Sequence, residues 1–135
     1  MKLETTIFVE PTPKARPRTT IRKGRVVTYT PRGTAHAENL IRDKAMELGI
    51  FFDAGVPLRV EATFYRPKPK STPKRVALPV ARPDWDNYGK LLTDALEKFV
   101  YPSDSAITTC TIRKRFGSPP RIELSIEPDY PSPTG

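Results

Sequence analysis

Two aspartates flank a tryptophan in the segment RPDWDNYGK, and a lysine follows the second aspartate by four residues. Asp84, Asp86 and Lys90 are the residues whose types and spacing indicate chemistry. Carboxylate oxygens are the ligands that hard divalent cations prefer, and a neighbouring lysine can stabilise charge that develops on a phosphate. A third acid, Asp104, stands in VYPSDSAIT just ahead of a predicted strand. If that strand runs back past the start of the helix, the three carboxylates converge, and their mutual repulsion favours a bound Mg²⁺ or Mn²⁺.

Each of these residues also has a simpler structural explanation. Asp84 follows a proline at the expected start of a helix, where a capping side chain is worth about 1 kcal/mol, although a cap accounts for only one of the two aspartates. Lys90 lies one turn after Asp86 and one turn before Asp94, which fits two ion pairs of about 0.3–0.5 kcal/mol each. From spacing alone, the ion-pair and the phosphate-binding interpretations of Lys90 both stay open.

Other metal sites share the D-x-D pattern. The segment resembles the start of a calcium-binding EF-hand loop, but Tyr88 and Ala95 occupy the fifth and twelfth positions. The twelfth position of that loop requires a bidentate glutamate, so calcium is excluded. A glycosyltransferase metal site is disfavoured because the chain is short and has no glycine-rich phosphate loop.

The charge balance favours a polyanionic partner. The 135 residues include 23 Lys and Arg against 15 Asp and Glu, a net charge of +8. Basic surfaces gain affinity for nucleic acids by releasing counterions from the phosphates. No apolar run approaches the ~20 residues of a membrane span, and the N-terminus lacks the apolar segment of a secretory signal. The single cysteine, Cys110, indicates a small packed residue in a reducing compartment, so we expect a cytoplasmic protein without membrane contact.

The pattern of apolar residues predicts a single α+β domain. Two helices are expected, one from Thr34 to a stop at Gly49 and one from Asp84 to about Phe99, because each has an apolar stripe of helical period. Alternating polarity predicts strands over 3–10, 25–30, 57–65, 106–115 and 120–127, with 25–30 as a hairpin partner of the first. We expect a mixed β-sheet with the two main helices packed on it, a domain over 1–128 and a flexible tail over 129–135.

Two proline-rich basic segments are predicted to contact DNA. They follow the first strand and the strand at 57–65, and fixed φ angles at proline reduce the entropy lost when such a loop docks on a phosphate backbone. Trp85, between the two acids, is expected to anchor the helix start in the core or in a dimer interface, with stacking on a base as the alternative. The predicted DNA-binding residues are Lys14, Arg16, Arg18, Lys68, Lys70, Lys74, Arg75 and Arg82.

These motifs together resemble the RusA family of Holliday-junction resolvases, which is common in bacteriophages and prophages. The resemblance rests on RPDWDNYGKLLTDAL followed by VYPSDSAI, on PTPKARPR near the N-terminus and on RPKPKS, and it extends from about residue 7 to 115. One departure is the turn before the strand, where many members carry two adjacent acids and this chain has Ser103 before Asp104. Activity is expected to survive, because Asp104 takes the second of those positions.

The resemblance implies the roles of the site residues. Asp84, Asp86 and Asp104 would be the metal-binding catalytic acids and Lys90 the catalytic lysine, with Mg²⁺ or Mn²⁺ as the cofactor. Asp94 matches the helix aspartate of the family. The partner implied is four-way junction DNA, and the products would carry 5′-phosphate and 3′-hydroxyl ends.

The sequence thus predicts a Mg²⁺-dependent, structure-selective endodeoxyribonuclease that resolves Holliday junctions by paired phosphodiester hydrolysis in recombination and repair. Because a four-way junction has near two-fold symmetry and must be cut on two strands, two equivalent sites are needed, and a C2 homodimer supplies them. Two alternatives remain: a basic nucleic-acid-binding module without catalysis, and a general nuclease for branched DNA.

Overall fold

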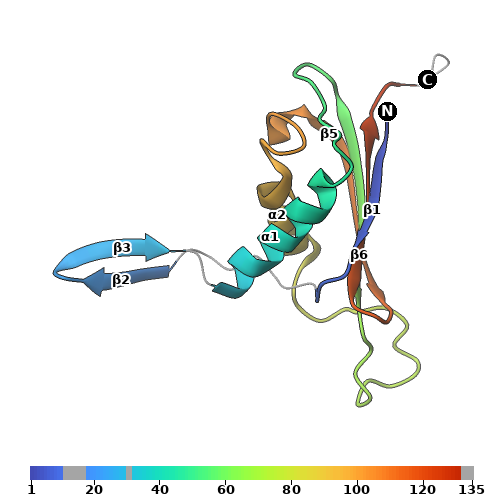
Figure 1. Cartoon of the computed structure of the whole chain (residues 1–135). Helices are drawn as coiled ribbons and strands as arrows, with labels where there is room; N and C mark the ends of the chain where they lie inside the picture. The colour runs from blue at the N-terminus through green and yellow to red at the C-terminus, as the bar shows by residue number, and fades with distance from the viewer. Residues whose placement is uncertain (11–17, 30–31, 132–135) are drawn as a thin grey trace.

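The computed structural model describes residues 1–10, 18–29 and 32–131, and it forms the mixed α+β domain that the sequence predicts. A four-stranded sheet has the strand order β1-β6-β4-β5, in which β4 and β5 are parallel and the other neighbours antiparallel. Both helices cover the same face of this sheet (Figure 1). The elements are β1 (Leu3–Ile7), β2 (Arg18–Arg22), β3 (Arg25–Tyr29), α1 (Arg32–Met46), β4 (Leu58–Arg66), α2 (Trp85–Leu96), the 3-10 helix η1 (Asp104–Ala106), β5 (Ile107–Phe116) and β6 (Arg121–Pro128).

The core lies between the sheet and the helices. Alternation along β4 and β6 turns every second side chain toward α1 and α2, and each fully buried aliphatic or aromatic side chain stabilises the fold by roughly 1.5–3 kcal/mol. Phe64 of β4 stacks on Tyr88 of α2 with ring centroids 4.7 Å apart, which fixes the helix against the strand. The buried set includes Leu58, Val60, Ala62, Ile122, Leu124, Ile126, Ala37, Ile41, Ala45, Leu91, Leu92, Ala95 and Leu96.

The ends of the helices differ slightly from the sequence expectation. Gly49 does stop the first helix: its φ is +66°, and its N–H donates to the Met46 carbonyl at 3.0 Å. Phe99 does not point into the core, because α2 ends at Leu96. Its ring is 39% exposed and lies under the Arg42 guanidinium, 4.0 Å from the centroid.

The strand predicted over 25–30 pairs with a different partner from the one expected. β3 forms a separate two-stranded hairpin with β2, whereas β1 pairs with β6. The turn at Lys23 and Gly24 has positive φ at both residues, 51° and 75°, which matches the right-handed twist of the strands that it joins. Figure 1 shows the hairpin extending away from the sheet on the side of the helices. Lys14 and Arg16 lie outside the described residues, while Arg18 opens β2.

The expected packing of Cys110 is wrong, because β5 is an edge strand and leaves this cysteine exposed. Within the part of the chain that the structure describes, neither helix is long and apolar enough to span a membrane.

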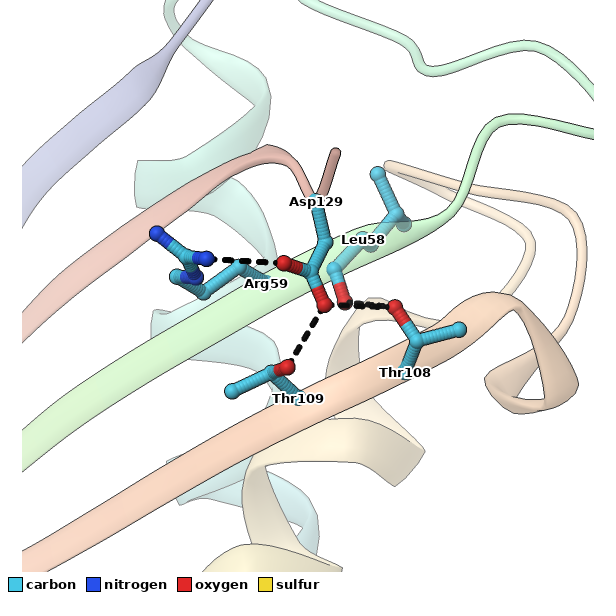
Figure 2. Close-up of polar contacts among 5 residues, drawn as sticks. All are labelled: Leu58, Arg59, Thr108, Thr109 and Asp129. Carbon is cyan, nitrogen blue, oxygen red and sulfur yellow. Dashed lines mark hydrogen bonds and ion pairs between the residues drawn. The ribbon is translucent and has the colours of Figure 1, made fainter. Parts of the chain in front are cut away.

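A polar network joins three strands where β4 and β5 begin and β6 ends (Figure 2). The Asp129 carboxylate accepts hydrogen bonds from the hydroxyls of Thr108 at 2.7 Å and Thr109 at 2.5 Å, and it pairs with the Arg59 guanidinium at 2.8 Å. Thr108 also lies 3.3 Å from the Leu58 carbonyl. The domain boundary at 128 stays a prediction, but Asp129, one residue beyond it, is held firmly. Because β5 starts directly after η1, this network also anchors the strand that follows Asp104.

Candidate active site

The first predicted site residue, Asp84, stands at the N-cap position of α2 but does not cap it. Its backbone is extended, with φ −71° and ψ 156°, and its side chain makes no capping hydrogen bond. The capping explanation for Asp84 is therefore wrong, and its exposed carboxylate is left for another role. Asp86, in the first turn of α2, is also exposed.

Two basic side chains from the sheet hold the segment that leads into Asp84. The Arg66 guanidinium at the end of β4 donates to the Arg82 carbonyl at 3.0 Å, and the Lys114 ammonium of β5 donates to the Ala81 carbonyl at 2.9 Å. Charge-assisted contacts of this kind are stronger than neutral hydrogen bonds. Nothing in the sequence indicated these contacts, because the partners are separated by 16 and 33 residues.

Trp85 points away from the core, and its side chain is 63% exposed. Val80, in the preceding loop, is also exposed, at 87%. The expectation that Trp85 anchors α2 in the core is therefore wrong. Its role at a dimer interface and its alternative role in base stacking both stay predictions.

Asp104 is presented by the single turn of η1, and Ser103 caps that turn. Ser103 has an extended backbone, and its hydroxyl oxygen accepts a hydrogen bond from the Ser105 N–H at 3.3 Å. An aspartate or a serine can serve equally as such a cap. The serine that departs from the family pattern thus caps the turn that presents Asp104.

The Asp104 carboxylate lies in a partly buried polar cluster that the sequence did not reveal. The Tyr101 hydroxyl donates to Asp104 Oδ1 at 2.7 Å, and the Asp104 N–H donates to Glu97 Oε2 at 2.8 Å. Burial raises the pKa of Asp104, and the Glu97 charge raises it further, whereas the Tyr101 hydrogen bond and the Lys90 charge act in the opposite direction. The only available signal was the short spacing of Glu97, Tyr101 and Asp104 along the chain.

The structure confirms the ion pair of Lys90 with Asp94, whereas the phosphate-binding interpretation of Lys90 stays a prediction. Its ammonium pairs with Asp94 Oδ1 at 3.1 Å, as an i,i+4 ion pair. Its side chain is nevertheless 62% exposed, and its charge lowers the pKa of Asp104. The Lys90 ammonium is therefore paired with Asp94 and open to solvent.

The three predicted acids lie toward opposite ends of α2. Asp84 and Asp86 are at its N-terminal end, whereas the Asp104 backbone is bonded to Glu97, the residue that caps its C-terminal end. Eleven residues of helix separate positions 86 and 97, about 16 Å at 1.5 Å per residue. Lys114 of β5 contacts Ala81, so β5 runs from the Asp104 end toward the Asp84 end.

Carboxylate oxygens suit a hard divalent cation, but these carboxylates stand at the two ends of α2. Over residues 1–10, 18–29 and 32–131, no three His, Cys, Asp or Glu side chains are grouped so as to hold a metal ion. The structure therefore places Asp104 at the C-terminal end of α2, and among the described residues it does not group Asp104 with Asp84 and Asp86 into a cation site.

The loop between β4 and α2 presents four of the eight predicted DNA-binding cations to solvent. Turns organise it, with Thr72 N–H donating to the Pro69 carbonyl at 2.9 Å and Val76 N–H to the Pro73 carbonyl at 3.0 Å. Lys68 braces the loop from within, since its ammonium lies 3.3 Å from the Lys74 carbonyl. The exposed cations of this loop are Lys70, Lys74, Arg75 and Arg82.

The fold and these residues define a class: a basic α+β protein with carboxylates at both ends of one helix, exposed at its start and partly buried at its end. Residues 9–127 match the family described as Endodeoxyribonuclease RusA, and this match covers most of the chain. The chain belongs to the RusA endodeoxyribonuclease family. It is also 29% identical over 131 residues to a protein of Bacillus subtilis (strain 168) named "Uncharacterized protein YqaN", covering 90% of this chain and 92% of that protein.

Proposed function

We propose that the protein is a Mg²⁺-dependent endodeoxyribonuclease that resolves Holliday junctions by paired cuts, in DNA recombination and repair. Membership of the RusA family supports the nuclease class. The single observation that carries the assignment to this site is that Asp104 is bonded to Glu97, at the end of the helix α2 that also carries Asp86 and Lys90 and starts after Asp84. A carboxylate and an exposed ammonium so placed form half of a phosphodiester-cleaving site within a molecule of net charge +8.

In this proposal, Asp84, Asp86 and Asp104 hold Mg²⁺ or Mn²⁺. The bound cation supplies a water of lowered pKa and neutralises charge on the phosphoryl oxygens. Lys90 binds a phosphate or leaving oxygen of the cut strand, because its ammonium is exposed on the same side of α2 as Asp94. Cleavage leaves 5′-phosphate and 3′-hydroxyl ends.

We further propose that a homodimer completes the site. Asp104 is bonded to Glu97 at the C-terminal end of α2, whereas Asp84 and Asp86 stand at its N-terminal end, and over the described residues the three acids are not grouped so as to hold one cation. A second copy related by a two-fold axis can bring the N-terminal end of its own α2 to Asp104. The same symmetry places two sites on the molecule, which suits two opposing strands of a four-way junction.

The loop between β4 and α2 and the β2–β3 hairpin are the proposed tracks for the DNA backbone. The loop leads directly into Asp84 and exposes Lys70, Lys74, Arg75 and Arg82. At the hairpin tip, Lys23 and Arg25 are also exposed. Contacts of this kind position the junction by charge and shape, with sequence preference added at the cut.

The test is cleavage of a synthetic four-way junction by the wild type and by Asp86→Asn, with Mg²⁺ or with EDTA. Paired, metal-dependent nicks that are lost in the variant support the proposal. Equal cutting of flaps, forks and junctions would instead make the protein a general branched-DNA nuclease.

A second candidate function is a basic nucleic-acid-binding module without catalysis. The separation of the acids within one chain favours it, because a chain that never brings them together has no complete cation site. Tight junction binding with no cutting under any divalent cation would establish this alternative.

A further inference from the structure

Two residues that have no role in the proposed reaction so far, Tyr101 and Glu97, hold Asp104 through separate contacts. The Tyr101 hydroxyl bonds to the Oδ1 atom of Asp104 at 2.7 Å, and Glu97 Oε2 receives the Asp104 backbone N–H at 2.8 Å. The first contact orients the carboxylate, and the second holds the backbone from which the carboxylate projects. Asp104 is therefore restrained both at its carboxylate and at its backbone N–H.

Both residues are themselves fixed to the end of α2. Glu97 is the C-cap residue of the helix, and its N–H donates to the Thr93 carbonyl at 2.9 Å. A backbone bridge joins Glu97 to Tyr101, and Lys98 N–H donates to the Tyr101 carbonyl at 2.7 Å. Tyr101 is fully buried, so the core determines where its hydroxyl lies. Side chains locked in this way can position a functional group to within a fraction of an ångström.

We propose that Glu97 and Tyr101 are positioning residues of the nuclease site, which set the direction in which Asp104 presents its second carboxylate oxygen. This inference rests on the proposed function, because it assigns the two residues to a reaction in which Asp104 takes part. Oδ1 accepts the tyrosine hydrogen bond, so Oδ2 would be the oxygen available to a cation. Neither Glu97 nor Tyr101 needs to contact the cation or DNA, since both act through Asp104.

The chemistry of Tyr101 suits this role. Burial raises the pKa of its hydroxyl, and the hydrogen bond to Asp104 raises it further. A phenylalanine would fill the same space in the core and remove only the donor.

The test compares Tyr101→Phe, Glu97→Ala and Glu97→Gln with the wild type. Glutamine keeps an oxygen acceptor for the Asp104 N–H but removes the charge, so it separates the hydrogen bond from the negative charge. Glu47→Ala is the matched control. Glu47 is an exposed glutamate just after α1, and its carboxylate pairs with Lys44 of that helix at 3.0 Å. Two readouts are measured: kcat and KM on a four-way junction with Mg²⁺, and hydrogen exchange of the Asp104 amide in the metal-free protein.

We expect Tyr101→Phe and Glu97→Ala to lower kcat roughly 10- to 100-fold, as small misplacements of a reacting group do. KM should stay within about twofold of the wild type, because the DNA contacts are unaffected. Glu97→Gln should recover most of the kcat lost in Glu97→Ala. The Asp104 amide should be protected in the wild type and in Glu97→Gln, and should exchange rapidly in Glu97→Ala.

Other outcomes would overturn the inference. If the wild type cuts normally and Tyr101→Phe and Glu97→Ala cut equally well, the two residues position nothing, while the proposed function stands. If Glu97→Gln is as impaired as Glu97→Ala, the charge of Glu97 acts directly and the positioning role is wrong. If the wild type cuts no junction with any divalent cation, the proposed function fails and the assignment of these residues to a reaction fails with it.

Discussion

Mixing two inactive variants would test whether the site is assembled from two chains. Asp86→Asn removes a carboxylate at the N-terminal end of α2, and Asp104→Asn removes the one beside its C-terminal end. Loss of one cation ligand removes several kcal/mol of transition-state stabilisation. At 1.36 kcal/mol per tenfold, each variant alone should be at least about 100-fold slower than the wild type.

The separation of these carboxylates along α2 gives the mixture a definite expectation. If each site takes Asp86 from one chain and Asp104 from the other, a mixed dimer has one site with both changes and one intact site. Random exchange of equal amounts makes about half of the dimers mixed, so roughly a quarter of all sites are intact. The mixture should therefore nick junctions at about a quarter of the wild-type rate, roughly 25-fold faster than either variant alone. It should produce single nicks, because a mixed dimer cuts only one strand.

The assay is the rate of nicking of a labelled four-way junction after co-expression of the two variants with different affinity tags. A mixture of Asp84→Asn and Asp86→Asn is the matched control, since both changes lie at the same end of α2. Every site in that mixed dimer carries one change, and no recovery is expected. If tandem purification proves that mixed dimers form and the Asp86→Asn and Asp104→Asn mixture stays inactive, the two-chain site is refuted.

Three further outcomes follow from the structure. Asp84→Asn and Asp86→Asn should bind a four-way junction as tightly as the wild type or more tightly, because an acid near phosphates is removed; a large loss of affinity in a gel-shift titration would contradict their assignment. Lys70→Ala should weaken binding and reduce the slope of log affinity against log salt by ~1 for one lost phosphate contact, and an unchanged slope would remove Lys70 from the DNA path. Asp129→Asn should lower the melting temperature at neutral pH, because hydrogen bonds from Thr109 and Thr108, and the Arg59 charge, lower the pKa of Asp129 in the folded protein. A carboxyl whose pKa is lower in the folded than in the unfolded protein stabilises the fold above its unfolded-state pKa, and this stabilisation is lost as the pH falls through its folded-state pKa. The difference in melting temperature between the wild type and Asp129→Asn should therefore close below about pH 4. A difference that persists in acid would refute the charge of Asp129 as its source.

Most of the fold was predictable because it depends on local patterns. The alternation in 57–65 and 120–127 identified two central strands, and the apolar stripes identified both helices. The partner of the strand at 25–30 was predicted wrongly, because alternation shows that a segment is a strand but not which strand lies beside it. The tight turn at Lys23 and Gly24, which closes the hairpin with 18–22, was the overlooked signal.

The candidate site was predictable in its residue types but not in its arrangement. Spacing correctly placed Lys90 one turn from Asp94, and the 3.1 Å ion pair follows from helix geometry alone. Spacing could not show that Trp85 is exposed, or that Arg66 and Lys114 hold the carbonyls before Asp84. Those contacts depend on how β4, β5 and the loop meet in space.

The chemistry of this protein was determined by the order of its residues: a basic chain, four charged side chains at family spacing and two helices with apolar stripes. These features are local, since charge is additive and helical period places side chains a few residues apart. Only the tertiary structure decided that Asp104 lies beside the C-terminal end of α2, bonded to Tyr101 and Glu97, and not beside Asp84 and Asp86. The physical reason is the direction of β5: it runs away from Asp104 along α2, so that its far end, not its beginning, reaches the start of the helix.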